Sequence, residues 1–326
     1  MSEKKVRWGV LGTANIARWC TIPGMKKADN CELYAIAGRS AEKAKRFAEE
    51  FGIEKYYGSY EELLQDESVQ AVYIPLPNHL HLPWVTKALR AGKHVLCEKP
   101  LAINAAEARE MYKTARECGR ILMEAYAYLH SPYVDSLKKD VESGVIGEVN
   151  YIDTAFVTQG YEEDFRLHKE FGGGAMYDLG CYCTTMVLSL IDSEPELVTA
   201  SAEFTDLGVD MLTSGQIRFA NGARASFNVG MNLGEHSNSR FDRLYIHGSK
   251  GSIRSDVEYN QEGTVCYRIQ NACGVTERTV FVPQNYALEV SQLGRCILDG
   301  EQPHITEEFS VKNAELIDRV LGEIGY

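Results

Sequence analysis

Long apolar runs, paired cysteines and an excess of positive charge are all missing from this sequence of 326 residues. No hydrophobic run approaches the ~18–20 residues of a membrane-spanning helix. The first residues, 1–5, are polar and lead directly into a strand pattern, so we expect no signal peptide. The nine cysteines include no C-x-x-C pair, which argues against a disulfide scaffold or a zinc cluster. These absences predict a cytoplasmic protein with reduced thiols.

The charge balance is acidic, with 34 Lys and Arg against 46 Asp and Glu and a formal net charge of −12. This balance argues against nucleic acid or an anionic membrane as the main partner, although a local basic pocket remains compatible with it. Hydrophobic residues at 44% and charged residues at 25% are typical of a folded globular protein. Single hydrophobic cores stop growing near ~250–300 residues, so the length predicts two domains.

The N-terminal part of the chain alternates short apolar segments with amphipathic ones. Ser40, Asn104 and the Ser59–Glu62 pair are helix-capping signals that stand between the apolar segments. Strands separated by helices in this way are joined by right-handed crossovers, which predicts a doubly wound, mainly parallel sheet. The expected strands are 6–11, 33–37, 69–74, 94–97 and 121–125.

The pattern changes after about residue 124, where long β-rich stretches replace the alternation. The pair Asn221-Gly222 predicts a hairpin, because both residues tolerate positive φ. We therefore predict an α/β first domain over 1–124 and an α+β second domain, with an open and mainly antiparallel sheet, over 125–326. Its expected strands are 148–158, 198–204, 211–219, 223–231, 243–247 and 265–269, with helices near 132–143, 287–298 and 306–322.

A glycine-containing loop follows the first expected strand. The run GTANIA at 12–17 is a G-x-A-x-x-A variant of the dinucleotide-binding G-x-G-x-x-G fingerprint. Gly12 permits the tight turn, small Ala14 lets backbone N–H groups approach a pyrophosphate, and Ala17 allows close helix packing. A bare strand–turn–helix is the alternative, but the position in a first βαβ unit favours a dinucleotide-binding Rossmann domain. The expected contacts are Gly12, Thr13, Ala14, Asn15 and Ile16.

The end of the second expected strand indicates which dinucleotide is bound. It reads Ala-Gly-Arg-Ser at 37–40, without the acid that usually binds the ribose 2′-hydroxyl of NAD. Arg39 can pair with a 2′-phosphate and stack on adenine, Ser40 can donate its hydroxyl, and Lys43 adds charge one turn later. The alternative is that Arg39 is a solvated loop residue. The pattern favours NADP over NAD as cofactor.

Two longer motifs carry a family resemblance. Residues 73–102 read YIPLPNHLHLPWVTKALRAGKHVLCEKPLA, and residues 171–182 read FGGGAMYDLGCY. The Glu-Lys-Pro at 98–100 combined with the later G-G-G-x-x-x-D-x-G-x-Y resembles the glucose–fructose oxidoreductase / inositol dehydrogenase (Gfo/Idh/MocA) family. The resemblance covers both expected domains. Within the family the sequence is most similar to the NADP-dependent sugar and trans-dihydrodiol dehydrogenases.

Residue chemistry at these motifs suits proton and hydride transfer. Lys99 follows a buried strand at the sheet edge where α/β ligands bind, and its ammonium can stabilise developing oxyanion charge, with Glu98 as orienting partner. Tyr182 lies four residues after Asp178, so both can share a helix face, and a phenol near an ammonium has a lowered pKa. A solvated lysine and a core tyrosine are the alternatives. The resemblance implies that Lys99, Asp178 and Tyr182 are catalytic; Tyr182 stands where the inositol dehydrogenase branch carries His.

The resemblance also implies further binding residues. In the family, the turn after the strand that ends near residue 74 lines the nicotinamide ribose. Leu129 stands where the family often has Arg, a departure on the substrate side. His79 and His81 have no Cys or acidic companion nearby, so we expect no metal site. The implied cofactor contacts here are Leu76, Asn78, His81, Glu98 and Lys99, and the implied substrate contacts are Lys99, His130, Tyr161, Arg166, Asp178 and Tyr182, with Phe165 and His168 also lining the pocket.

Together these features predict an NADP-dependent oxidoreductase that moves a hydride between nicotinamide and a secondary alcohol or carbonyl of a sugar or cyclic diol. Two alternatives stay open: a glycosidase that oxidises its sugar transiently on a held nicotinamide, and a non-catalytic dinucleotide and sugar sensor. An exposed sheet face in the second domain predicts a homodimer or homotetramer, because a second subunit would cover it.

Overall fold

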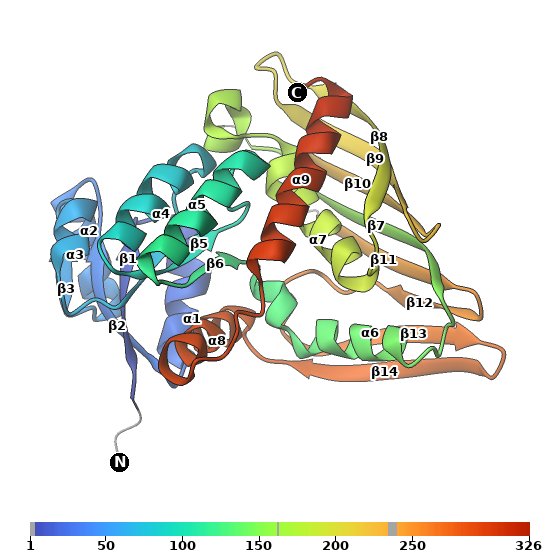
Figure 1. Cartoon of the computed structure of the whole chain (residues 1–326), viewed down its shortest axis with the longest axis horizontal. Coiled ribbons are helices and arrows are strands. Elements are labelled where there is room, and N and C mark those ends of the chain that lie inside the picture. The colour runs from blue at the N-terminus through green and yellow to red at the C-terminus, as the bar shows by residue number, and fades with distance from the viewer. Residues whose placement is uncertain (1–3, 162, 234–239) are drawn as a thin grey trace. The chain divides into compact units, whose positions relative to one another are not determined.

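The computed structural model describes residues 4–161, 163–233 and 240–326. These residues form two compact units (Figure 1). The first unit holds the described residues up to His130 together with Gln284–Val311, and the second holds Ser131–Pro283 together with Lys312–Tyr326. Each unit has its own sheet and its own buried core.

The first unit is a doubly wound parallel sheet, as predicted. Its strand order is β3-β2-β1-β4-β5-β6, and every neighbouring pair in it is parallel. The strands are β1 (Val6–Leu11), β2 (Cys31–Ala37), β3 (Lys55–Tyr57), β4 (Ala71–Ile74), β5 (His94–Glu98) and β6 (Leu122–Ala125). The helices are α1 (Ile22–Lys27), α2 (Ala41–Phe51), α3 (Tyr60–Gln65), α4 (His81–Arg90), α5 (Ala105–Cys118) and α8 (Asn285–Asp299).

The predicted helix caps are present. The Ser40 hydroxyl accepts a hydrogen bond from the Lys43 N–H at 3.3 Å, and Ser59 and Asn104 cap α3 and α5 in the same way. Gly52 ends α2 in the left-handed conformation, with φ of 66°. Local capping chemistry therefore fixes where these helices begin and end. Helix α1 and the three-residue strand β3 were not predicted.

The second unit contains an eight-stranded sheet in the order β14-β13-β12-β11-β7-β10-β9-β8. Among the described strands of this unit, only β7 and β10 pair in parallel, so the prediction of an open, mainly antiparallel sheet is confirmed. Helices α6 and α7 pack against the sheet (Figure 1). Its elements are α6 (Pro132–Glu142), β7 (Val149–Gln159), α7 (Cys181–Leu190), β8 (Pro195–Phe204), β9 (Asp210–Phe219), β10 (Arg224–Leu233), β11 (Arg240–Gly248), β12 (Gly251–Ser255), β13 (Gly263–Asn271) and β14 (Gly274–Val282).

The hairpin predicted at Asn221-Gly222 joins β9 to β10. Arg218 pairs with Arg224 across it, and Gly222 has a φ of 88°, which a residue with a side chain rarely adopts. Strands β12 and β14 were not predicted. Strand β14 is exposed along most of its length, so it lacks the apolar alternation that would reveal a strand in the sequence.

The division into units differs from the single boundary expected after residue 124. Helix α8 belongs to the first unit, because it packs on α1: a Cβ at Gly24 would lie 2.8 Å from the Tyr286 carbonyl carbon. The Asn30 amide also donates a hydrogen bond to the Ser291 carbonyl at 2.8 Å. Contacts of this kind join residues far apart in the chain, and a composition change along the sequence does not show them. The last helix, α9 (Glu307–Ile324), contains the boundary in the chain between Val311 of the first unit and Lys312 of the second.

In the described part of the chain, no helix combines the length and the apolar character needed to cross a bilayer.

Candidate functional site

The glycine-containing loop opens onto a cavity of about 280 Å³ in the first unit. At Gly12 the backbone has a φ of 140°, and a Cβ there would lie 3.3 Å from Leu76, so a side chain would be strained and crowded. The cavity is lined by Gly12, Thr13, Ala14, Arg39, Ser40, Lys43, Tyr60, Pro75, Leu76 and Pro77. Seven of the predicted cofactor contacts thus line one cavity, and Asn15 and Ile16 follow immediately in the chain.

The charge of this cavity suits a phosphate. Arg39 and Lys43 are cationic, Ser40 caps the N-terminus of α2, and no acid is among the lining residues. A helix N-terminus with nearby cations is a ready-made anion site. Tyr60 adds an aromatic wall that the sequence did not reveal; its ring packs edge-on against Trp84 at 4.8 Å between centroids. The residues present therefore fit the 2′-phosphate end of NADP.

A hydrogen-bonded chain holds Glu98 at the end of β5. The buried Tyr73 hydroxyl donates to Glu98 Oε1 and accepts from the Thr21 hydroxyl at 2.9 Å. Burial, followed by the nearby Glu98 carboxylate, raises the pKa of Tyr73 well above its ordinary value, so Tyr73 remains a donor. The other Glu98 oxygen accepts from the Lys99 N–H at 3.3 Å. Glu98 is thus oriented by β4 and bonded to the backbone of Lys99.

His81 joins two loops beneath the surface. One ring nitrogen lies 2.8 Å from the Leu76 carbonyl, and the other lies 3.0 Å from the Pro100 carbonyl. Burial lowers the pKa of His81, which favours the neutral ring. The side chain is fully buried, as is most of Asn78. His81 therefore fixes the loop after β4 against the segment that follows Lys99, and its predicted direct contact with the cofactor stays a prediction.

In the second unit, Asp178 is buried and pairs with Arg166. The Arg166 Nε lies 2.9 Å from Asp178 Oδ2, and its Nη1 lies 3.0 Å from Asp164 Oδ1. The guanidinium stacks over Tyr161 and Phe165, at 5.0 and 4.6 Å from the ring centroids. Burial alone would lower the pKa of Arg166, but the carboxylate charges outweigh it and raise the pKa. Four residues predicted to contact substrate or line its pocket are thus brought together.

The glycine run before Asp178 is needed for packing. Gly174 has a φ of 105°, and a Cβ there would overlap Asp210 Oδ1. The Asp210 carboxylate accepts hydrogen bonds from the Met176 N–H at 2.8 Å and the Thr213 hydroxyl at 2.6 Å. Asp210 thus anchors the π-helical turn Met176–Gly180 that carries Asp178. No local signal in the sequence marks Asp210, because it lies 32 residues further along the chain.

Tyr182 lies half-buried in the first turn of α7, within an aromatic cluster. Its ring centroid is 5.3 Å from both Phe156 and Tyr259. Arg240 stacks over Phe156 at 4.4 Å and pairs with Asp242. Although burial opposes the charge of Arg240, Asp242, Glu258 and Tyr182 raise its pKa, so a permanent cation stands beside the Tyr182 phenol. The sequence did not reveal Phe156, Arg240 or Tyr259.

Two predicted histidines have different surroundings. His130 is buried in the first unit, with its ring edge-on to His304 at 5.0 Å. His168 is exposed in the second unit and lies 3.6 Å from the Glu170 carboxylate. The structure therefore does not place His130 in the same unit as Asp178 and Tyr182.

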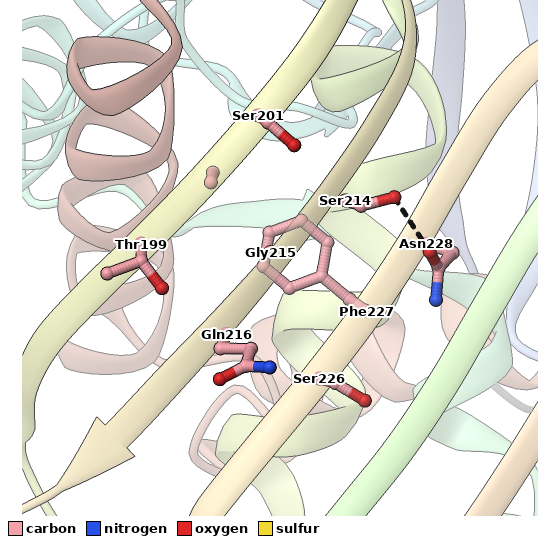
Figure 2. A pocket seen from close by; sticks show the side chains of 9 residues that line it. Thr199, Ser201, Ser214, Gly215, Gln216, Ser226, Phe227 and Asn228 are labelled. Carbon is pink, nitrogen blue, oxygen red and sulfur yellow. Dashed lines mark hydrogen bonds between the residues drawn. The ribbon is translucent and has the colours of Figure 1, made fainter.

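A second cavity of about 500 Å³ lies over strands β8, β9 and β10 (Figure 2). The Ser214 hydroxyl donates to Asn228 Oδ1 at 2.7 Å, and the Phe227 ring lies against Gly215. The cavity is lined by Thr199, Ala200, Ser201, Ser214, Gly215, Gln216, Ser226, Phe227 and Asn228. None of these groups titrates near neutral pH, so this surface offers no acid/base chemistry.

Comparison with known proteins agrees with this architecture. Residues 6–126 match a family described as an oxidoreductase family with an NAD-binding Rossmann fold, and residues 134–254 match the GFO/IDH/MocA C-terminal domain. The chain is 31% identical to D-xylose 1-dehydrogenase (NADP(+)) 2 of Haloferax volcanii, over 96% of this chain and 95% of that one. It is 30% identical to trans-1,2-dihydrobenzene-1,2-diol dehydrogenase of Xenopus tropicalis, over 98% of both chains.

A solved structure is similar over almost the whole length. The 3-ketoreductase of Actinomadura kijaniata, in complex with NADP and TDP-benzene, matches with a TM-score of 0.92 and 30% identity over 98% of both chains. That protein has also been solved with one tyrosine replaced by phenylalanine and with one lysine replaced by alanine.

The fold and the site define a two-domain oxidoreductase with a dinucleotide-binding first domain. The chain belongs to the GFO/IDH/MocA oxidoreductase family.

Proposed function

We propose that this oxidoreductase uses NADP to move a hydride between nicotinamide and a secondary alcohol or carbonyl of a sugar or cyclic diol. The observation that carries the cofactor choice is the cavity lined by Arg39, Ser40 and Lys43, without an acid. A relative named for NADP and a similar structure with bound NADP support it. The substrate class rests on relatives named for a sugar and for a dihydrodiol.

Within this proposal, Tyr182 is the acid/base that exchanges a proton with the substrate oxygen. Lys99 is the electrophilic partner that stabilises charge on that oxygen, and Asp178 orients the site through its ion pair with Arg166. A dinucleotide bound by these residues would supply the hydride chemistry at its nicotinamide. The cation of Arg240 beside Tyr182 supports a proton-transfer role, because a nearby positive charge favours the phenolate.

The first test compares the binding of NADPH and NADH by fluorescence titration of the purified protein. We expect tighter binding of NADPH, and Arg39→Ala should weaken it about tenfold or more, since a hydrogen bond to a charged group contributes ~1.5–3 kcal/mol. NADH binding should change little.

Arg46→Ala is the matched control for Arg39→Ala. Arg46 lies on α2, the helix that begins two residues after Arg39, and it is exposed and does not line the cavity, so this variant should bind NADPH like the parent. Equal losses for NADPH and NADH in Arg39→Ala, or a preference of the parent for NADH, would reject the assignment of NADP. Turnover is then sought with NADP and a panel of sugars and cyclic diols.

We also propose that a second copy of this chain covers the open face of the eight-stranded sheet. Tyr151 and Phe241 lie on this face with exposed fractions of 37% and 46%, beside the ion pair of Asp153 and Arg243. Exposed aromatic residues on a broad sheet face are typical of subunit interfaces. The nine free cysteines support the further prediction of a reducing, cytoplasmic location.

Light scattering coupled to size-exclusion chromatography tests the interface. We expect a dimer or tetramer for the parent and a smaller species for Phe241→Lys, because a buried unpaired cation is costly. Leu207→Lys is the control, since Leu207 is exposed in the turn between β8 and β9. A parent that elutes as a monomer contradicts the proposal.

A further inference from the structure

A buried carboxyl lies behind the segment that carries Lys99. Glu124 stands near the end of β6, next to β5, and is only 2% exposed. Its Oε1 accepts a hydrogen bond from the Leu101 N–H at 2.8 Å. Leu101 directly follows the Glu-Lys-Pro motif, so the carboxylate holds the backbone two residues after Lys99.

The surroundings of Glu124 come from several elements of the first unit. Tyr112 on α5, Cys97 on β5 and Ser310 on α9 face it, together with Tyr126, which follows β6. Lys99 is the cation that acts on it, and Glu307 is the further acid near Tyr112. Glu98 and Glu124 both act on Cys97, so Glu98 is a second acid in these surroundings.

Burial raises the pKa of Glu124 to about 7, although Ser310, the Leu101 N–H, Tyr126 and Lys99 all act to lower it. Glu124 is therefore charged above about pH 7 and neutral below it. Lys99 is one of the groups that favour the charged form of Glu124, so the Glu124 carboxylate and the Lys99 ammonium attract one another.

We propose that Glu124 is a positioning residue for Lys99: its carboxylate holds the backbone that follows Lys99 and attracts the Lys99 ammonium. This inference rests on the proposed function, in which Lys99 stabilises charge on the substrate oxygen. The hydrogen bond to Leu101 fixes the backbone on one side of Lys99, and Glu98 fixes it on the other side. Glu98 and Glu124 thus hold the backbone at two points next to Lys99, and Glu124 is the more deeply buried of the two.

The variant that separates charge from hydrogen bonding is Glu124→Gln. A glutamine oxygen can still accept from the Leu101 N–H, but it carries no charge. The reactivity of Lys99 toward an acylating reagent is measured by mass spectrometry as a function of pH, in the cofactor-free protein. We expect the midpoint of Lys99 labelling to move down by about one pH unit in Glu124→Gln, because an ammonium without its carboxylate loses its proton more easily.

Glu107→Gln is the matched control, since Glu107 has a partly buried carboxyl in the same unit, at the start of α5. Its backbone N–H, which the substitution keeps, donates to the Asn104 cap. In Glu107→Gln, the pH dependence of Lys99 labelling should match that of the parent. Thermal unfolding of both variants shows whether they fold, and a Glu124→Asp variant, which keeps the charge, should return the labelling midpoint toward the parent value.

Activity gives the second readout. If substrates are found, kcat/KM of the parent should fall below about pH 7 as Glu124 is protonated, and Glu124→Gln should lose this limb. An unchanged Lys99 labelling midpoint in folded Glu124→Gln overturns the inference even if the enzyme is active. A shifted midpoint in a protein that binds no dinucleotide and turns over no substrate rejects the proposed function alone.

Discussion

Lys99→Met is expected to lower kcat about 10²–10³-fold while leaving the binding of NADPH within a few-fold of the parent. Methionine has nearly the same length and retains the apolar stem, but it cannot donate a hydrogen bond or carry charge. Removing one donor that stabilises an oxyanion costs about this much in other enzymes. The backbone of Lys99 stays in place, because Glu98 and Glu124 bond to main-chain N–H groups on either side.

Tyr182→Phe should produce a loss of similar or larger size, since general acid/base catalysis contributes about 10²–10⁴-fold. The phenylalanine ring keeps the contacts with Phe156 and Tyr259, so the helix α7 should remain folded. The pH dependence of the residual rate identifies the proton carrier. The titration of the carrier is missing from the pH profile of the variant that lacks this residue and is still present in the profile of the other variant.

Steady-state kinetics with the best substrate measure these losses. Lys113→Met and Tyr177→Phe are the controls, because Lys113 is exposed on α5 and the buried Tyr177 ring packs against Tyr326. Both should keep kcat within about twofold. If Lys99→Met and Tyr182→Phe behave like these controls, neither residue is catalytic and the proposed roles are wrong.

The sequence predicts best those parts of the site that are built from neighbouring residues. Gly12, Arg39, Ser40 and Lys43 follow the ends of two adjacent parallel strands, and the parallel topology alone places such ends at one sheet edge. The helix caps and the hairpin at Asn221-Gly222 are likewise local, because each depends on two or three successive residues.

The surroundings of Tyr182 and Asp178 could not be predicted in this way. Phe156, Arg240 and Tyr259 reach Tyr182 through the register of an eight-stranded sheet, in which β7 pairs with β11 across about 90 residues of chain. Asp210 reaches the glycine run from β9. Contacts of such long range leave no periodic signal, so the residue types alone do not identify them.

The same reasoning applies to Glu289, whose placement is only visible in the structure. Glu289 lies on α8 with an exposed fraction of 1%, and neither of its carboxyl oxygens has a hydrogen-bond partner among the described residues. Burial, followed by the charge of Glu98, raises the pKa of Glu289 well above its ordinary value. The folded protein therefore holds this proton to higher pH than the unfolded chain, which releases it near ~4.3.

This difference in proton binding makes the first unit less stable as the pH rises. Since the folded state binds one proton more than the unfolded state, the free energy of unfolding should fall by about 1.4 kcal/mol per pH unit between ~4.3 and the raised pKa of Glu289. Glu289→Met removes this slope and also removes an unpaired buried polar group. We expect the variant to be more stable than the parent by about 2 kcal/mol or more at pH 8, and by less at pH 5.

Urea unfolding at pH 5 and pH 8, followed by circular dichroism, measures the effect. Glu308→Gln serves as the control, because Glu308 is exposed at the start of α9, and its stability should follow the parent at both pH values. Equal stability of Glu289→Met and the parent at pH 8 would show that the carboxyl is solvated or paired in solution. If the stability of Glu289→Met changes little between pH 5 and pH 8 while that of the parent falls, the folded protein holds the Glu289 proton to higher pH than the unfolded chain does.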